Sequence, residues 1–261
     1  MKVVILCGGK GTRIRELTET LPKPMIPIGG RPIIWHIMKY YSCFGFNDFV
    51  LCLGYKGDVI RNYFINYGMD NADMTITIGK SLPVVRHVKT DEDGWNVSLV
   101  ETGLDSMTGA RVRKIRKYIG DDENFMLTYG DGVGNVNIEA LLQFHKEHGR
   151  IATVTGVHPP GRFGELEYDN QSGKVYGFNE KPQVTGGRIN GGFFVFNKKV
   201  FDYLNDSDDL VLEQQPMKKL VSDDQLVVFK HDGFWQPMDT SREYGLLNDM
   251  VTNNKAPWIL W

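Results

Sequence analysis

The first thirty residues constrain the fold more than any other stretch of the chain. An apolar, β-branched run from Lys2 to Cys7 ends abruptly at Gly8-Gly9-Lys10-Gly11-Thr12-Arg13. Such a run predicts a buried strand, and glycines at its end let backbone N–H groups approach an anion. Most short glycine clusters only connect a strand to the next element of the fold. The loop alone therefore leaves a simple turn and a phosphate site as alternatives.

Two cations make the phosphate site the better interpretation. Arg13 closes the glycine loop, and Lys23 lies further along between Pro22 and Pro24, whose rings restrict the backbone that carries it. The combination GGxGTR and then PKPM is dense and specific. It predicts an anion site at the end of the first strand.

Composition narrows the class of partner. The chain has 261 residues and a formal net charge of −2, which argues against nucleic acid or a membrane surface as the main partner. It has no window of about eighteen apolar residues, and its first strand is too short for a signal peptide. We expect a cytoplasmic protein that acts on small molecules. Cys7, Cys43 and Cys52 lie in apolar segments without CxxC spacing, as expected of reduced core thiols.

Strand and helix patterns alternate through the first eighty residues. A helix is predicted from Arg31-Pro32 to Gly45, then a buried strand over 49–53, a helix over 59–67 and a strand over 74–78. This order is typical of an α/β fold, with a Rossmann-like, mostly parallel mixed sheet flanked by helices. Ligands bind such sheets at the carboxyl ends of the strands. One domain is expected, since α/β domains reach this length.

The middle of the chain carries two β-prone runs, at 83–88 and 97–101, and two ambiguous motifs. One motif lies between the runs and the other follows them. Asp91 and Asp93 match an Asp-x-Asp metal clamp, but no apolar strand precedes them, so a solvated turn is favoured. A basic helix is predicted over 110–119, with most of its cations facing solvent. Arg111, in its first turn, could reach a ligand at the helix N-terminus, although capping alone would explain the loop before it.

A second strand-end motif is Gly130-Asp131-Gly132, directly after the buried strand over 125–129. A carboxylate at a buried edge has little structural reason to be there. Mg²⁺, in contrast, usually takes one or two protein carboxylates and completes its octahedron with phosphate oxygens and water. We interpret Asp131 as a Mg²⁺ ligand, with a turn residue as the alternative.

The second half of the chain changes to an antiparallel pattern. A helix over 138–148 and a strand over 151–157 precede hairpin strands over 165–168 and 175–179. Glu180 and Asn190 can bond sugar hydroxyls, glycines such as Gly191 let the backbone meet them, and Lys181 can bind a phosphate.

Two further features complete the pattern. His145 and His148 fall on one helix face, where a solvent-facing pair is favoured over a metal site because no third ligand is near. A strand over 226–229 precedes a segment that puts Asp239 beside aromatic residues, and a helix is predicted over 241–250. The apolar tail over 255–261 is expected to pack on the body or on a neighbouring subunit.

These motifs together resemble the sugar-1-phosphate nucleotidyltransferase family. The resemblance is carried by GGxGTR, by PKPM-x-x-I-G-x-x-P-I at 22–33, by Gly130-Asp131 and by Glu180-Lys181-Pro182. Further segments are similar to the branch of that family that uses CTP: 35–39, 106–109, 128–133, 159–164, 189–194, 233–240 and 255–258. The similarity spans nearly the whole chain. Departures are Cys7, where the family usually has Ala, and Leu212 and Gln215, where it usually has Trp and Glu.

The resemblance implies a reaction in which CMP passes from CTP to α-D-glucose 1-phosphate, giving CDP-glucose and pyrophosphate, with Mg²⁺ as cofactor. It also implies dideoxysugar and O-antigen (lipopolysaccharide) biosynthesis and a homo-oligomer, with trimer and hexamer as candidates. The sugar-phosphate oxygen would attack the α-phosphorus in line, so no protein nucleophile is needed and catalysis is positioning plus charge neutralisation. The expected parts are a nucleotide-binding half (1–150), a sugar-phosphate-binding half containing the hairpins (151–240) and a C-terminal helix and tail (241–261).

The resemblance, together with the motifs, assigns residue roles. The catalytic residues expected are Arg13, Lys23 and Asp131. The nucleotide-binding residues expected are Leu6, Gly8, Gly9, Gly11, Thr12, Arg13, Lys23, Ser106, Arg111, Tyr129 and Gly130. The sugar-phosphate-binding residues expected are Glu180, Lys181, Asn190 and Gly191, and the Mg²⁺ ligands expected are Asp131 and Asp239.

The residues leave alternatives open. UTP, dTTP or another sugar 1-phosphate could be the substrate, because backbone groups can distinguish cytosine from uracil without leaving a residue signature. A glycosyltransferase that consumes a nucleotide sugar would share the fold but would not release pyrophosphate from CTP. A non-catalytic binding protein would be expected to lack the charged residues named above, and the chain keeps them.

Overall fold

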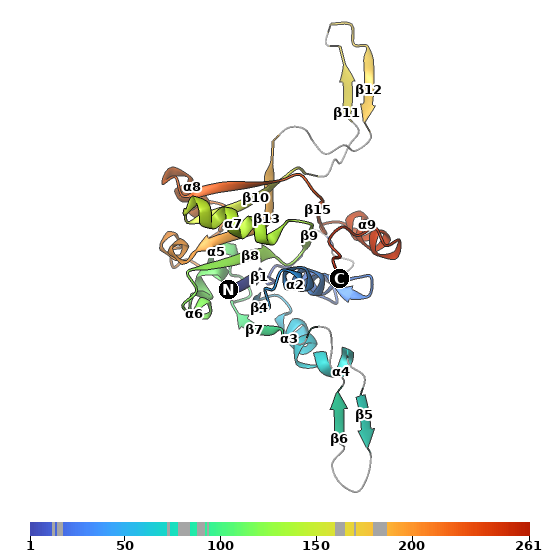
Figure 1. The fold of residues 1–261 in the computed structure, drawn as a ribbon, viewed down its shortest axis with the longest axis vertical. Coiled ribbons are helices and arrows are strands. Elements are labelled where there is room, and N and C mark those ends of the chain that lie inside the picture. Colours follow the sequence, from blue (N-terminus) through green and yellow to red (C-terminus); the bar gives the residue numbers. More distant parts are fainter. Residues whose placement is uncertain are drawn as a thin grey trace.

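The centre of the molecule is a seven-stranded sheet in the order β14-β10-β13-β8-β1-β4-β7 (Figure 1). This computed structural model describes residues 1–11, 14, 18–71, 74–77, 84–87, 92, 94–159, 165–169, 171–179 and 187–261. The strands of the sheet are β14 (Leu226–His231), β10 (Ala152–Val157), β13 (Ile189–Asn197), β8 (Asn124–Tyr129), β1 (Lys2–Leu6), β4 (Asp48–Leu53) and β7 (Asn96–Glu101). Only β13 runs against its neighbours in this sheet. The expected mostly parallel, mixed α/β sheet is confirmed.

Helices cover both faces of the sheet, so the central strand β1 is buried on both sides. Val3 and Ile5 point into one core cluster and Val4 and Leu6 into the other. The first cluster includes residues of α2 (Ile33–Cys43), α3 (Gly57–Ile65), α7 (Ile138–His148) and α9 (Ser241–Thr252). The second includes residues of α5 (Thr108–Lys114), α6 (Arg116–Ile119), the 3₁₀ helix η3 (Lys198–Tyr203) and α8 (Gln215–Ser222). Two-sided burial explains why β1 is a continuous apolar run and not an alternating one.

The prediction of a third parallel strand over 74–78 is wrong. β5 (Met74–Thr77) pairs antiparallel with β6 (Val84–His87) in a separate hairpin, and β7 takes the expected place beside β4. The β-prone run over 74–78 does not show which strand it pairs with, so its sequence could not distinguish a hairpin strand from a strand of the central sheet. Figure 1 shows this hairpin beyond the β7 edge of the sheet, next to α4 (Tyr67–Asn71).

Two helix predictions also change. Pro32 is the N-cap of α2, so it precedes the first turn of the helix. It belongs to the short strand β3 (Arg31–Pro32), which pairs with β2 (Pro27–Ile28). The single helix expected over 110–119 is α5 and then α6, with the break at Ile115. α7 matches its prediction, because Asn137 caps its first turn and Gly149 ends it in the left-handed conformation.

The second half contains the expected antiparallel hairpin, β11 (Glu165–Tyr168) with β12 (Val175–Asn179), which Figure 1 shows at the opposite end of the molecule from β5 and β6. The tail packs on the body as expected, because Trp258 is fully buried and its indole N–H donates to His36 Nδ1. Asp91 and Asp93 lie outside the described residues.

The predictions for two side chains are corrected. Cys43 is exposed at the end of α2, whereas Cys7 and Cys52 are buried as expected. His145 is buried and not solvent-facing, because α7 packs against β10 and both His145 and His148 share Thr153 Oγ1 as a hydrogen-bond partner. Among the described residues, no helix is long and apolar enough to cross a membrane.

Candidate active site

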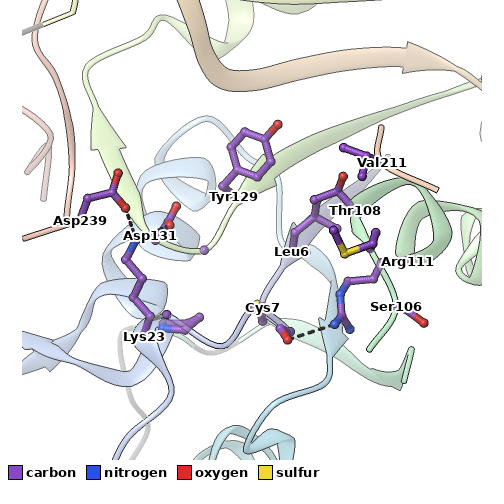
Figure 2. A pocket seen from close by; sticks show the side chains of 16 residues that line it. Leu6, Cys7, Lys23, Ser106, Thr108, Arg111, Tyr129, Asp131, Val211 and Asp239 are labelled. Atoms are coloured by element: carbon purple, nitrogen blue, oxygen red, sulfur yellow. Dashed lines mark hydrogen bonds and ion pairs between the residues drawn. The ribbon is translucent and has the colours of Figure 1, made fainter. Parts of the chain in front are cut away.

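A pocket of about 370 Å³ opens at the carboxyl ends of β1 and β8, where the sequence placed the anion site. Figure 2 shows Lys23, Asp131 and Asp239 at one end and Ser106, Thr108, Arg111 and Val211 at the other, with Leu6 and Cys7 between them. The lining residues described are Leu6, Cys7, Gly8, Gly9, Gly11, Lys23, Pro24, Ser106, Met107, Thr108, Arg111, Tyr129, Gly130, Asp131, Val211 and Asp239.

A small antiparallel sheet brings the two distant aspartates together. β9 (Gly132–Gly134) pairs with β15 (Trp235–Pro237), so that Gly132 lies opposite Pro237. Asp131 directly precedes β9 and Asp239 lies just after β15, and the N–H of Met238 donates to the carbonyl of Asp131 at 2.8 Å. The capping box of α9, formed by Thr240 and Glu243, then fixes the chain just beyond Asp239.

Lys23 lies between these two carboxylates. Its Nζ is 2.6 Å from Asp131 Oδ2 and 2.6 Å from Asp239 Oδ1, while the residue as a whole is only 8% exposed. Burial acts to lower the pKa of Lys23, but attraction and hydrogen bonding to Asp131 and Asp239 outweigh it and leave the pKa raised. Lys23 is therefore a charged, nearly buried ammonium held by both acids.

The acid pair fits a hard divalent cation. Two carboxylate oxygens converge on one point that a cation already occupies, and oxygen is the ligand atom that Mg²⁺ prefers. The described residues contain no group of three or more His, Cys, Asp and Glu side chains that could hold a metal. A site with two carboxylates suits Mg²⁺, which commonly completes its shell with phosphate oxygens and water.

Arg111 lines the other end of the pocket, and its guanidinium is hydrogen-bonded within the chain. It is 4% exposed, and its guanidinium donates to the carbonyls of Gly8, Leu53, Gly103 and Leu104 and to Thr102 Oγ1. It thus ties the β1 loop to the ends of β4 and β7. In the first turn of α5, the N–H of Ala110 donates to the carbonyl of Leu210.

At two positions near the strand ends, neighbouring atoms lie so close to the backbone that only glycine fits without displacing them. A Cβ on Gly8 would lie 2.1 Å from Arg111 Nη1, so any side chain there would displace the guanidinium. A Cβ on Gly130 would lie 3.0 Å from the carbonyl oxygen of Leu6 and 3.1 Å from Pro24 Cγ. Gly130 therefore lets the end of β8 pack closely against the end of β1 and against η2 (Lys23–Met25).

The hydroxyl of Ser106 is held in one orientation. Its Oγ donates to the carbonyl of Thr102 at 2.6 Å and accepts from Lys114 Nζ at 2.7 Å. Because the hydroxyl proton of Ser106 is donated to the Thr102 carbonyl, Ser106 Oγ can only accept a hydrogen bond from a ligand.

A network of side-chain hydrogen bonds connects the pocket to β13, the strand that carries Asn190. The phenol of Tyr129 donates to Glu213, and the hydroxyl of Thr108 donates to the other oxygen of the same carboxylate at 2.6 Å. Asn190 Nδ2 donates to the Tyr129 hydroxyl at 3.2 Å. Burial and the adjacent Glu213 both raise the pKa of Tyr129, which keeps the phenol protonated.

The chain matches the nucleotidyl transferase family over residues 2–244. It belongs to that family. It is 49% identical to the glucose-1-phosphate cytidylyltransferase of Salmonella typhi over 261 residues, which is the full length of both chains. It is 43% identical, again over both full lengths, to a probable glucose-1-phosphate cytidylyltransferase of Bacillus subtilis. The resemblance inferred from the motifs is confirmed.

A solved structure supports the fold of this nucleotidyl transferase. HddC from Yersinia pseudotuberculosis, crystallised with GMP-PN, aligns with a TM-score of 0.68 and 22% identity. The alignment covers 96% of this chain and 99% of that one.

The structure of this nucleotidyl transferase gathers most of the predicted site residues in one pocket. Leu6, Gly8, Gly9, Gly11, Lys23, Ser106, Arg111, Tyr129, Gly130, Asp131 and Asp239 all line it. Asn190 lies next to the pocket through Tyr129, and the carbonyl of Gly191 accepts from the indole of Trp235 at 2.7 Å. The predictions for Thr12, Arg13, Glu180 and Lys181 fall outside the described residues.

Sequence reasoning did not assign six residues of the site region. Cys7, Pro24, Met107, Thr108 and Val211 line the pocket, and Glu213 binds both Thr108 and Tyr129. The sequence could have pointed to Glu213, because this residue is next to Leu212, in the segment where the chain departs from the family pattern. Leu212 is fully buried in the second core cluster, which orders the segment without the Trp that is usual there.

Proposed function

We propose that this nucleotidyl transferase transfers CMP from CTP to α-D-glucose 1-phosphate, forming CDP-glucose and pyrophosphate. The observation that carries the proposal is the 49% identity, over both full lengths, to an enzyme named for that activity. The pocket supports it, because an ammonium, two carboxylates and a glycine loop converge at the ends of β1 and β8.

The nucleotide is proposed to lie along the β1 loop. Its triphosphate would meet the backbone from Gly8 to Gly11 together with Arg13, and its base would lie toward Ser106 and the helix that carries Arg111. Ser106 has acceptor capacity to offer, and cytosine has an exocyclic amino donor where uracil has a carbonyl. This complementarity favours CTP over UTP and dTTP.

The sugar phosphate is proposed to enter from the β13 side, bound by Glu180, Lys181, Asn190 and Gly191. Tyr129 lies between this side and the nucleotide side, because its hydroxyl contacts both Asn190 and Glu213. The two substrates would therefore meet beside Asp131, Asp239 and Lys23.

Transfer needs positioning and charge neutralisation but no protein nucleophile. A phosphate oxygen of the sugar phosphate attacks the α-phosphorus in line with the departing pyrophosphate. Lys23 would neutralise charge on the α-phosphate, and Asp131 with Asp239 would hold Mg²⁺. The bound ion would stabilise the charge that builds up on the phosphate oxygens.

The wider setting is also a proposal. CDP-glucose formation would supply dideoxysugar and O-antigen synthesis in the cytoplasm. The tail presents exposed Leu260 and Trp261, which suits contact with another copy in a homo-oligomer.

Product analysis tests the proposed reaction. ³¹P NMR of the protein with CTP, α-glucose 1-phosphate and Mg²⁺ should show CDP-glucose and pyrophosphate forming in equal amounts, and only when both substrates are present. Lys23→Ala should be slower by roughly 10²–10³, the cost typical of losing one well-placed charge-stabilising group. Formation of CMP or free phosphate in place of CDP-glucose would reject the proposal.

A further inference from the structure

We propose that Lys23 occupies the cation position between Asp131 and Asp239 in the nucleotide-free protein and leaves it when a divalent cation binds together with nucleoside triphosphate. Lys23 would act as a built-in competitor of the metal ion, so that metal and nucleotide bind as a unit. The inference rests on the proposed function for the identity of the ligands, and on the geometry of the three side chains for the competition.

The first observation is that the Lys23 ammonium and a metal ion bound to both acids would occupy the same point in the pocket. The Lys23 ammonium donates to Asp131 Oδ2 and Asp239 Oδ1, each at 2.6 Å. Figure 2 shows the Lys23 side chain rising from the pocket wall toward both acids. A Mg²⁺ ion bound to both acids would sit about 2.1 Å from their oxygens. Ammonium and metal therefore cannot both lie between the same pair of oxygens.

The second observation is the burial of the lysine. Its side chain is 9% exposed, against 35% for Asp131 and 20% for Asp239. An ammonium displaced from the acids without a new partner would be a buried charge next to a divalent cation, which is strongly unfavourable. We therefore expect a divalent cation to bind weakly in the absence of nucleotide.

The third observation is that only the side chain of Lys23 can move easily. Pro22 and Pro24 flank it, and η2 is fixed by backbone hydrogen bonds from Met25 to Pro22 and from Ile26 to Lys23. The ammonium can swing on its four-carbon stem while its backbone stays in place. The triphosphate, bound along the adjacent glycine loop, offers a phosphate within the reach of that stem.

Charge balance shows why the exchange requires nucleotide. Exchange of the Lys23 ammonium for a divalent cation between the two acids adds one positive charge at that point. The released ammonium then needs an anion. A phosphate group supplies it, so nucleotide and divalent cation should each strengthen binding of the other by the same factor.

The test uses Mn²⁺ alone as the probe, in the absence of nucleotide and sugar phosphate. Titration monitored by the EPR signal of free Mn²⁺ should show weak binding to the unmodified protein. Lys23→Met removes the ammonium at similar length and should bind Mn²⁺ at least tenfold more tightly. Asp131→Asn added to Lys23→Met should abolish that gain, which would locate the ion at the acid pair.

Lys10→Met is the matched control, because Lys10 forms an exposed ion pair with Asp105 at 2.9 Å and does not contact the acid pair. It should leave Mn²⁺ affinity unchanged. Lys23→Gln gives a second neutral variant should Lys23→Met not fold, and circular dichroism melts establish that each protein is folded.

Equal Mn²⁺ affinity in the unmodified protein and in folded Lys23→Met or Lys23→Gln would overturn the competition. A gain in the variants supports it whether or not pyrophosphate is released from CTP and glucose 1-phosphate. Failure of the proposed function and failure of this inference are thus seen in different assays.

Discussion

The phenol hydroxyl of Tyr129 donates a hydrogen bond to Glu213, although the two residues are 84 positions apart in the chain. Tyr129 ends β8 and Glu213 lies just before α8, while Thr108 at the start of α5 donates to the same carboxylate. Glu213 thus joins three segments at one side of the pocket. Its removal would leave both hydroxyls without this acceptor.

Glu213→Ala should loosen Tyr129 and, through it, the Asn190 side of the pocket. A hydrogen bond to a charged group contributes about 1.5–3 kcal/mol, so kcat/KM for glucose 1-phosphate should fall roughly tenfold or more. Steady-state kinetics with each substrate varied in turn would measure this. The adjacent, exposed Gln214 supplies the control, and Gln214→Ala should change neither constant appreciably. Equal kinetics for the two variants would remove Glu213 from the site.

Replacing either acid should weaken the response to metal. Asp131→Asn and Asp239→Asn each remove one anionic oxygen donor that the metal requires, so the Mg²⁺ concentration for half-maximal activity should rise at least tenfold. Asp105→Asn alters an exposed acid that pairs with Lys10 and should leave the Mg²⁺ dependence unchanged. Normal activity of Asp131→Asn at low Mg²⁺ would contradict the ligand role.

Gly8→Ala should destabilise the protein, whereas Gly9→Ala should not. A Cβ on Gly8 would meet Arg111 Nη1 at 2.1 Å and displace a guanidinium that makes several buried hydrogen bonds, which we expect to cost about 3 kcal/mol. For Gly9, no described heavy atom outside residues 8–10 lies within 4 Å of an added Cβ. Urea unfolding of both variants gives the comparison. Equal losses would mean that Arg111 does not tie these loops together.

His145 should make folding stability depend on pH. Burial, aided by His148, lowers the pKa of His145 from 6.5 to about 4, so between these values the unfolded chain binds more protons than the folded one. Stability should therefore fall as the pH drops through this window, and by ~2 kcal/mol between pH 7 and pH 5. His145→Gln cannot titrate and should show a smaller loss in urea unfolding at the two pH values. Equal slopes for the two proteins would exclude His145 as the cause.

The sequence was most informative where one local pattern decides the structure. β1, β4 and β8 are continuous apolar runs, and α7 has an Asn cap and a Gly stop, so their positions can be predicted from local residues alone. The glycine loop and the strand-end Asp131 were found for the same reason, since both come directly after buried strands. β5 was misplaced because a four-residue β-prone run carries no mark of the strand that it pairs with.

The remaining features depend on contacts between distant segments. Nothing in the residues around Arg111 shows that its guanidinium is used by four carbonyls, and the amphipathic pattern of α7 does not distinguish a buried His145 from an exposed one. The Lys23 contacts span 108 and 216 positions. The motifs indicated that these groups belong to one site, but only the fold shows that Lys23 and the two acids share one point.

A pyrophosphate-release panel gives the sharpest comparison of substrates. It crosses CTP, UTP, dTTP and GTP with the 1-phosphates of glucose, mannose and N-acetylglucosamine at saturating Mg²⁺. The proposed reaction predicts the highest kcat/KM for CTP with glucose 1-phosphate, and no pyrophosphate from any nucleotide in the absence of a sugar phosphate. A preference for another nucleotide or sugar, or pyrophosphate release from CTP alone, would contradict it.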